Sequence, residues 1–260
     1  MSNVTRIFAL RFDAEKKVVE KKEEYVPIEK RLHIFVNEEV IASLIMSPSF
    51  EKEAAIGYLL GEGYIQTIKE IQKINFNGDN VKIAIEAKDF ELQKEFIQST
   101  DCIGGCRARL SVQMPKIINE TKFSPEIIFK MLKELQERSK EWKATGGVHS
   151  ALLSTAEGEV VAFVEDISRF VAIDKIIGMA ALSNINFKKC MAVSSGRLPA
   201  EMVLKTARVG IPAVISRTAP LDSGIEAAEK TGLMLIGFAR GKRMNIYTHS
   251  ERILISEREQ

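Results

Sequence analysis

Strands and helices alternate through the second half of this 260-residue chain, and this alternation limits the possible folds most strongly. The apolar run that begins at Cys190 predicts a strand, which leads into an expected helix at Pro199–Val209. A strand at Ala213–Ser216 and a helix at Asp222–Lys230 follow, and Leu233–Phe238 predicts a further strand. Short strands separated by helices are typical of sheets with parallel strands. We therefore expect an α/β fold in this half, with a partly parallel sheet.

The first half of the chain predicts an α+β arrangement. Val4–Phe12 alternates as a strand does, and Arg31–Ala42 predicts a hairpin that turns at Asn37-Glu38. A second hairpin is expected within Ile71–Ala87, around an Asn-Gly turn. Between the hairpins a helix is expected, with Ser49 as its N-terminal cap.

A charged segment separates the two halves. A helix is expected at Ser124–Lys140, and the charged stretch Glu134–Lys143 is expected to connect two domains. A length of 260 residues is compatible with one large domain or two modest ones. We expect an N-terminal α+β domain at residues 1–122, which ends in a cysteine-containing loop, and an α/β domain at residues 123–260.

Composition excludes several classes of protein. A formal net charge of +2 gives no general attraction to nucleic acid or to an anionic membrane. There is no apolar run of about 18 residues and no apolar signal core at the start. Three cysteines, an odd number, do not suit a secreted disulfide framework. We expect a soluble cytoplasmic protein with free thiols that binds neither nucleic acid nor membrane.

Two of the three cysteines, Cys102 and Cys106, stand at the ends of a Cys-x3-Cys segment that contains Gly104-Gly105. A thiol acts as nucleophile, metal ligand or redox partner in its thiolate form, which Arg107 and Arg109 would favour. The segment therefore predicts group transfer from an exposed loop. The alternatives are small apolar side chains without chemistry or a metal clip. Because structural zinc sites usually show two closely spaced ligand pairs, no metal site is predicted.

A candidate anion site follows the strand that begins at Cys190. Ser195, Gly196 and Arg197 lie between this strand and the expected helix, and Pro199 suits the first helical position. Free backbone amides at the helix start, together with these side chains, would bind an anion such as phosphate. A well-capped turn without a ligand is the alternative.

Two more loops, Ser216–Pro220 and Phe238–Arg243, occupy equivalent strand ends. Ligands of open α/β sheets bind at the edge where such loops meet. The basic side chains expected there are Arg197, Arg217, Arg240, Lys242 and Arg243. His149 is the candidate functional histidine, because Gly146-Gly147 before it allow the backbone to approach a ligand closely. Together these residues predict a phosphorylated ligand that contains a nucleotide.

Acidic and basic residues also gather between Glu165 and Lys175, just before and within a helix expected near Asp174–Leu182. Asp166, Asp174 and Lys175 would serve either as general acids and bases or in a salt-bridged turn, which is the more common reason for such a run. The remaining cysteine, Cys190, is expected in an inert core position.

Several sequence blocks, in this order, resemble the formate dehydrogenase accessory sulfurtransferases, the FdhD family. The resemblance runs from about Phe35 to Arg252. The blocks are Val36-Asn-Glu, Met46-Ser-Pro, Gly57-Tyr-Leu-Leu-Gly-Glu-Gly, the cysteine segment, Thr145-Gly-Gly-Val-His-Ser-Ala, Glu165-Asp-Ile-Ser-Arg, Ala172-Ile-Asp-Lys-Ile-Ile-Gly, Ser195-Gly-Arg with Glu201, Gly237-Phe-Ala-Arg-Gly and Asn245-Ile-Tyr-Thr.

The resemblance implies a sulfurtransferase. Such a protein accepts sulfur from a cysteine desulfurase as a cysteine persulfide and passes it to the molybdenum or tungsten bis-pterin guanine dinucleotide cofactor of formate dehydrogenase. It also implies a homodimer and a C-terminal domain similar to the cytidine deaminase fold, with a mixed sheet and flanking helices. That domain is expected to bind the guanine nucleotide part of the cofactor, so a guanine nucleotide is expected to bind in its place. The family's cofactor segment matches Phe238, Ala239, Arg240, Gly241, Lys242 and Arg243.

The chain departs from the family pattern at two places. The usual loop is Cys-Gly-x-Cys-Gly, whereas Cys102-Ile-Gly-Gly-Cys106 has one more residue between the thiols. Because Cys102 follows Ser99-Thr100, we assign the persulfide to Cys102 and an assisting role to Cys106. The reverse assignment stays open. The family commonly has Arg-His-Asn-Ala where this chain has Arg169-Phe-Val-Ala172, so no role for that histidine carries over.

Two other functions are compatible with parts of the pattern. A non-catalytic chaperone would hold the nucleotide cofactor and bring it to an apo-enzyme, with the cysteines incidental. A zinc hydrolase of the deaminase type would need His-x-Glu followed by Pro-Cys-x-x-Cys. The chain has His149-Ser-Ala instead, and no such cysteine pair follows. The sulfurtransferase is therefore the leading hypothesis and the chaperone the alternative.

Overall fold

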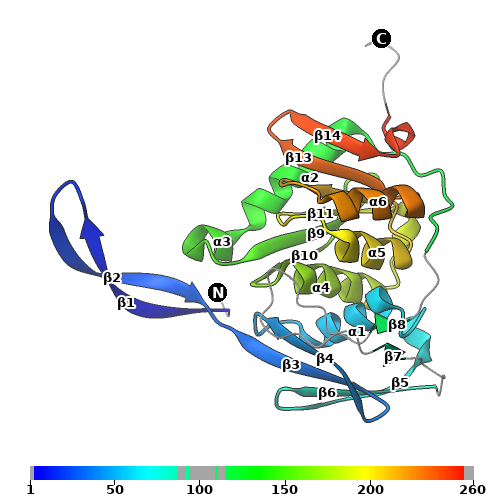
Figure 1. Cartoon of the computed structure of the whole chain (residues 1–260), viewed down its shortest axis with the longest axis horizontal. Helices are drawn as coiled ribbons and strands as arrows, with labels where there is room; N and C mark the ends of the chain where they lie inside the picture. The colour runs from blue at the N-terminus through cyan, green and yellow to red at the C-terminus, as the bar shows by residue number, and fades with distance from the viewer. Residues whose placement is uncertain (1–2, 87–91, 94–108, 111–114, 255–260) are drawn as a thin grey trace.

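The chain is built around a six-stranded mixed sheet (Figure 1). The computed structural model describes residues 3–86, 92–93, 109–110 and 115–254. In spatial order the strands are β10 (Val160–Asp166), β9 (His149–Thr155), β11 (Cys190–Ser194), β12 (Ala213–Ser216), β13 (Met234–Arg240) and β14 (Arg243–Thr248). The neighbours β11, β12 and β13 are parallel, and the remaining neighbours are antiparallel. The expected α/β fold with a partly parallel sheet is confirmed.

Helices cover both faces of this sheet and make three layers (Figure 1). The helices are α4 (Arg169–Leu182), α5 (Ala200–Arg208) and α6 (Asp222–Thr231) on one face and α2 (Pro125–Arg138) on the other. Successive strand residues serve opposite faces, as the two-residue period of a strand requires. Ala192 thus belongs to the core under α4 to α6, and Val193 to the core under α2. Among the described helices, none has the length and apolar character needed to cross a membrane.

The expected helix at Ser124–Lys140 is interrupted. Helix α2 ends at Arg138, and a short helix α3 (Lys140–Thr145) begins after Ser139. The Ser139 hydroxyl donates to the carbonyl of Leu135 (2.6 Å) and lies 2.7 Å from the Ser150 hydroxyl. The Glu165 carboxylate accepts the backbone N–H groups of Glu141 and Trp142, at 2.9 and 2.8 Å. These contacts start a new helix in a different direction.

The N-terminal half forms a second, four-stranded sheet. Its strands are β4 (Glu39–Met46), β3 (Lys30–Val36), β6 (Asn80–Ile85) and β5 (Ile71–Asn77), in this spatial order. The two expected hairpins correspond to β3–β4 and β5–β6, and both are confirmed. The parallel pair β3–β6 joins them. Helix α1 (Glu51–Glu62) follows β4 and lies between this sheet and α4 (Figure 1).

The cap expected for helix α1 is wrong. Phe50, with a left-handed φ of 63°, occupies the N-cap position, and no side chain caps the helix there. The Ser49 hydroxyl instead donates to the side-chain oxygen of Asn3, a contact with the start of the chain. Glu51 and Glu53 in the first turn suit the positive end of the helix dipole and partly replace the missing cap.

Helices α1 and α4 pack backbone to backbone. A Cβ atom on Gly57 would lie 1.7 Å from the carbonyl oxygen of Asp174, and one on Gly178 would lie 1.9 Å from that of Glu53. Both positions therefore require glycine. Leu59 from α1 and Ile177 from α4 belong to one continuous hydrophobic core. The division of the chain at residue 122 stays a prediction, and the segments on either side of it share this core.

A long hairpin of β1 (Val4–Asp13) and β2 (Val18–Pro27) projects from the body (Figure 1). We call it the arm. The strand expected from Val4 is confirmed. The short strands β7 (Leu92–Gln93) and β8 (Arg109–Leu110) pair with each other on either side of residues 94–108. Three short 3-10 helices complete the described elements: η1 (Ile68–Glu70), η2 (Phe187–Lys189) and η3 (Ser250–Arg252).

Candidate functional site: two hollows at the strand ends

The loops that follow β11, β12 and β13 are joined by hydrogen bonds at one edge of the sheet. The Arg217 N–H donates to the Ser194 carbonyl (3.2 Å), and the Ser216 hydroxyl donates to the Gly196 carbonyl (2.6 Å). The guanidinium Nε of Arg240 donates to the carbonyl of Arg217 (2.7 Å). Three segments far apart in sequence thus meet at the carboxyl ends of the parallel strands, where ligands of such sheets bind.

Two hollows open at this edge. The first has a volume of about 500 Å³, and its wall includes Trp142, Gly147, Arg217 and Arg240. The second has a volume of about 460 Å³, and its wall includes Ser168, Arg169, Gly196 and Arg197. His149, Ser195 and Thr218 line both hollows, so the two adjoin along a common wall. Together they have the size of a small-molecule binding site.

Positive charge dominates these walls. Among the described residues that line the hollows are four arginines, Arg169, Arg197, Arg217 and Arg240, and no aspartate or glutamate. Burial and the neighbouring Arg197 lower the pKa of Arg169, and Glu201 opposes this shift. Guanidinium groups gathered in a partly desolvated hollow favour a phosphate or carboxylate ligand.

Gly196 makes room for Arg169. A Cβ atom at position 196 would lie 2.8 Å from Cβ and 2.9 Å from Cδ of Arg169. The guanidinium carbon of Arg169 lies 4.7 Å from the ring centroid of Phe170. A glycine on one side and an aromatic ring on the other therefore fix the path of this side chain along the second hollow.

His149 stands at the start of β9 in the common wall. Its Nδ1 lies 3.4 Å from the Ser195 hydroxyl, which also accepts the Ser150 N–H at 2.9 Å. Burial, and then the positive charge of Arg197, lower the pKa of His149. Both effects favour the neutral imidazole, and an anion bound beside Arg197 would make it easier to protonate.

Three backbone amides in the loop before α5 have acceptors within the protein. The Ser195 N–H donates to the Ser150 carbonyl, the Gly196 N–H to the Ser194 hydroxyl, and the Leu198 N–H to the Ala219 carbonyl. The helix begins at Ala200, with Pro199 as its N-cap. An anion site formed by the amides of the helix start itself stays a prediction, and the arginine side chains add positive charge at this edge.

The structure brings some of the predicted site residues together and leaves others apart. His149, Ser195, Gly196, Arg197 and Arg240 line the hollows. Of the rest of the predicted segment, Ala239 is buried in the core under α2, and Phe238 is 46% exposed with a φ of 50°. Gly241 and Lys242 form the exposed turn between β13 and β14, and the exposed Arg243 begins β14. Cys102 and Cys106 lie outside the described residues.

Sequence reasoning missed Arg169 and Trp142 as lining residues, whereas Thr218 lies in the predicted strand-end loop Ser216–Pro220. Arg169 and Trp142 come from α4 and α3, which lie outside the strand-end loops on which the site prediction was based. The block Glu165-Asp-Ile-Ser-Arg contained the only signal for Arg169.

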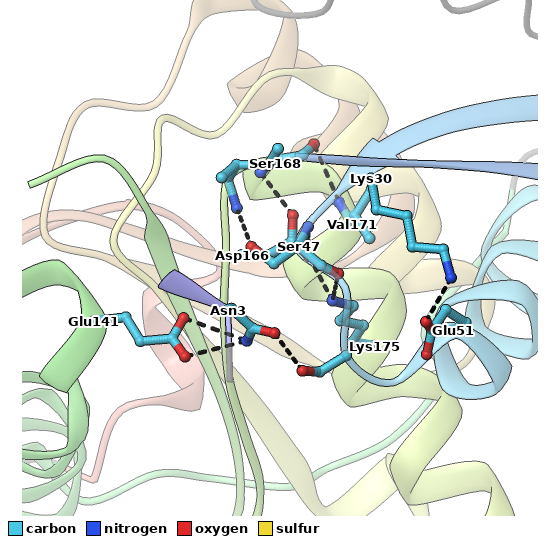
Figure 2. A network of polar contacts seen from close by, with 11 residues as sticks. Asn3, Lys30, Ser47, Glu51, Glu141, Asp166, Ser168, Val171 and Lys175 are labelled. Carbon is cyan, nitrogen blue, oxygen red and sulfur yellow. Dashed lines mark hydrogen bonds and ion pairs between the residues drawn. The ribbon is translucent and has the colours of Figure 1, made fainter. Parts of the chain in front are cut away.

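A buried polar network (Figure 2) adjoins the second hollow through Ser168, which lines it. The Asp166 carboxylate accepts hydrogen bonds from Lys175 Nζ (2.6 Å) and from the backbone N–H groups of Ser168 (2.7 Å) and Ser47 (3.1 Å). Asp166 and Lys175 side chains are fully buried. Burial raises the pKa of Asp166, and the Lys175 ammonium opposes this shift. The salt-bridged interpretation of this charge cluster is confirmed, and the network fixes the Ser168 turn that leads to Arg169.

Cys190 is an inert core residue, as expected. It is fully buried at the start of β11, and its Sγ lies 3.4 Å from the carbonyl oxygen of Asn186. Burial raises the pKa of this thiol to about 11, so it stays protonated at neutral pH.

Comparison with known proteins identifies the family. The family model described as "FdhD/NarQ family" matches residues 27–254. The chain belongs to the FdhD/NarQ family. A relative named sulfur carrier protein FdhD, from Methanothermobacter thermautotrophicus, is 37% identical, with 98% of this chain and all of that protein covered. A protein of the same name from Sulfolobus acidocaldarius is 33% identical, with 89% and 92% covered. The family resemblance of the sequence blocks is thereby confirmed.

A solved structure supports the fold of this FdhD/NarQ family member. The crystal structure of a protein from Desulfotalea psychrophila, assigned as a formate dehydrogenase accessory protein, superposes with a TM-score of 0.78. The two chains are 26% identical, and the match covers 97% of this chain and all of the other. A mixed α/β fold is common to both. The finer similarity to the cytidine deaminase fold stays a prediction.

Proposed function

We propose that this chain carries sulfur, as a cysteine persulfide, from a cysteine desulfurase to the molybdenum or tungsten bis-pterin guanine dinucleotide cofactor of formate dehydrogenase. The observation that carries the proposal is the pair of arginine-lined hollows at the strand ends. They suit a ligand with several phosphates, and such a ligand is what a sulfur carrier for this cofactor has to hold. The names of the relatives, sulfur carrier proteins, support the same function.

The sulfur step needs one nucleophilic thiolate. The thiolate attacks the outer sulfur of the donor persulfide, a new S–S bond forms on the carrier, and the donor cysteine leaves as a thiolate. No electrons are gained or lost overall, because one S–S bond replaces another. We assign the accepting thiol to Cys102, with Cys106 as the alternative, and this assignment rests on the sequence. Cys190 is unsuited because it is buried and its pKa is raised to about 11.

The nucleotide part of the cofactor would lie across the two hollows. Phosphate oxygens would lie against Arg197 and Arg169 in the second hollow. In the first hollow they would lie against Arg217 and Arg240. Trp142, which is 46% exposed and lines the first hollow, offers an aromatic face for a base. Phe238 lies on the predicted cofactor segment, is half-exposed and donates its N–H to the Thr218 carbonyl. Its ring offers a second aromatic face for a base.

Mass spectrometry of the intact protein tests the sulfur step. The wild type is incubated with a cysteine desulfurase and cysteine, beside Cys102→Ala, Cys106→Ala and, as a matched control, Cys190→Ala. The proposal predicts a gain of one sulfur atom that a reductant removes and that one of the first two variants lacks, while Cys190→Ala gains it as the wild type does. No gain in the wild type, with an active desulfurase present, would contradict sulfur transfer.

One observation favours a second function. The arginine-lined hollows suit ligand binding, which a non-catalytic chaperone for the cofactor would also need. The two functions differ in what the cysteines do. If the double variant Cys102→Ala/Cys106→Ala still activated the client enzyme as the wild type does, the chaperone would be favoured.

A further inference from the structure

Helix α3 contributes Trp142 to the wall of the first hollow but packs no side chain into the core. The helix is six residues long, and none of these residues is buried. An isolated helix of this length is not stable in water, because too few hydrogen bonds form to offset the ordering of its first turn. The position of Trp142 therefore depends on the contacts that fix the two ends of α3.

The start of α3 is bound by a carboxylate from a distant strand. The two oxygens of Glu165 accept the backbone N–H groups of Glu141 (2.9 Å) and Trp142 (2.8 Å). Ser139 occupies the N-cap position but makes no capping bond, and its hydroxyl donates to the carbonyl of Leu135 instead. Glu165 thus takes the place of an N-cap side chain and holds the backbone of Trp142 itself.

The sheet fixes Glu165 in turn. On β10, Glu165 lies directly opposite Ser150 of β9. Residues opposite each other in an antiparallel pair project from the same face of the sheet. The Ser150 hydroxyl lies 2.7 Å from that of Ser139, the residue between α2 and α3. One cross-strand pair therefore binds the junction of the two helices at adjacent points.

A second carboxylate acts on Glu165. The side-chain amide of Asn3 donates to both carboxylate oxygens of Glu141, at 3.1 and 3.3 Å (Figure 2). Burial raises the pKa of Glu141, and the charge of Glu165 adds to this shift although the bond from Asn3 opposes it. Glu165 thus meets repulsion from Glu141. Its two charge-assisted bonds to the backbone of α3 offset this repulsion.

The other end of α3 leads into the glycines of the hollow wall. Gly146, with a φ of 67°, ends the helix and donates its N–H to the Trp142 carbonyl (2.7 Å). Gly147 packs against Pro27, since a Cβ atom on this glycine would lie 2.7 Å from Pro27 Cγ. Trp142, Gly146 and Gly147 all line the first hollow. A shift at the start of α3 would therefore move this part of the wall.

We propose that Glu165 is a positioning residue of the nucleotide site, which holds Trp142 where its ring can stack on the base. Glu165 is not among the described residues that line either hollow, so it acts through α3. Arg217 and Arg240 lie at the ends of β12 and β13 and do not depend on α3. Glu165 should therefore affect binding of the base and leave binding of the phosphates unchanged. This inference rests on the proposed function, since it requires a nucleotide in the hollows.

A double-mutant cycle tests whether Glu165 acts through Trp142. Calorimetric titration with GDP compares the wild type, Glu165→Ala, Trp142→Ala and the double variant. Glu159→Ala removes the same charge from an exposed position of the same hairpin and is the matched control. We expect GDP binding to weaken about three- to tenfold in Glu165→Ala and at least about fivefold in Trp142→Ala. In the Trp142→Ala background, Glu165→Ala should add less than about twofold. Equal effects of Glu165→Ala in both backgrounds would overturn the proposal.

Pyrophosphate separates phosphate binding from base binding. Its affinity for Glu165→Ala should stay within about twofold of that for the wild type. An equal loss of affinity for GDP and for pyrophosphate would show that Glu165 supports the whole site, which contradicts a role through Trp142. If the wild type bound neither ligand, the nucleotide site would be wrong, and the role of Glu165 with it. If the wild type bound GDP and Glu165→Ala bound it equally well, only the role of Glu165 would be wrong.

Fluorescence of the ligand-free protein tests the positioning itself. Trp142 is the only tryptophan of the chain, so its emission reports on α3 alone. Time-resolved anisotropy should show a nanosecond local motion in Glu165→Ala that the wild type and Glu159→Ala lack. Glu165→Gln keeps the size of the side chain and one acceptor oxygen, and it should give an intermediate amplitude. Unchanged motion of Trp142 in both Glu165 variants would overturn the proposal.

Discussion

Two charge clusters within this fold differ in how their charges are balanced. Around helix α4, each buried lysine faces a carboxylate: Lys175 of α4 pairs with Asp166 of β10, and Lys205 of α5 pairs with Asp174 of α4 and lies 3.4 Å from Glu62 of α1. Around the hollows, by contrast, the described lining residues contribute four arginines and no carboxylate. The first cluster is complete within the chain and joins α4 to β10, α5 and α1. The walls of the second carry more positive than negative charge, although the Glu201 carboxylate acts on Arg169, and this surplus favours a ligand of the opposite sign.

The largest effect is expected in the balanced cluster. Asp166→Asn would leave the fully buried ammonium of Lys175 without its counter-charge. We expect a loss of about 3–5 kcal/mol in the free energy of unfolding, measured with denaturant. Glu134→Gln, which breaks the exposed Glu134–Arg138 pair, is the matched control and is expected to cost less than about 1 kcal/mol. Equal losses of stability in the two variants would contradict a structural role of the buried Lys175–Asp166 pair.

The arginine cluster is expected to respond in binding and hardly in stability. Arg197→Gln and Arg240→Gln should each weaken GDP binding by about ten- to a hundredfold, because each loses a charge-assisted hydrogen bond. Lys133→Gln, on the exposed side of α2, is the control and should bind as the wild type does. Calorimetric titration measures the affinities. If such a variant unfolded more easily but bound GDP as the wild type does, the arginine would stabilise the fold instead of binding the ligand.

The pH dependence of ligand binding should follow the protonation of His149. In the free protein, burial and Arg197 hold the pKa of His149 below its ordinary value. A bound phosphate offsets the charge of Arg197, so the pKa of His149 should rise in the complex, and binding then takes up a proton. Affinity should therefore increase as the pH falls from the pKa of the complex towards the pKa of the free protein, by about three- to tenfold.

NMR titration of the histidines gives both pKa values of His149, with and without ligand. His149→Gln should abolish this part of the pH dependence. A pKa of His149 that does not change on binding would show that the ligand does not lie beside Arg197.

The smallest effect is expected for Ser195→Ala. Its hydroxyl accepts the Ser150 N–H at 2.9 Å and joins the two hollows, so its loss should cost about 1 kcal/mol of stability and a few-fold in GDP affinity. Ser223→Ala, on the exposed first turn of α6, should change neither. Thermal unfolding and the same titration measure both quantities. If neither stability nor GDP affinity fell, the Ser195 hydroxyl would not be needed to hold the wall between the two hollows.

Much of the fold could be predicted because local signals and tertiary contacts agree. The Asn-Gly turn between β5 and β6 and the strand–helix alternation after Cys190 were sufficient to locate those elements. The predictions were wrong where contacts between residues far apart in the sequence determine the local structure. Ser49 binds Asn3 instead of capping α1. Helix α4 begins at Arg169, earlier than expected near Asp174, because Ser168 caps it within the Asp166 network.

The position of the candidate site could also be predicted from the sequence, but not the role of each group in it. Parallel strands bring their carboxyl ends to one edge, so Arg197, Arg217 and Arg240 could be expected together. The amides of Ser195 and Gly196 could not be excluded as ligands from sequence, because their acceptors depend on the folded positions of Ser150 and Ser194.

Titration of the wild type with GDP, beside guanosine as a matched ligand without phosphates, shows whether the arginine-lined hollows bind phosphate groups. We expect saturable binding of one GDP per chain and an affinity for guanosine at least about tenfold weaker, because the arginines act on the phosphates. Equal binding of the two ligands, or no saturable binding of GDP, would contradict phosphate binding by these arginines.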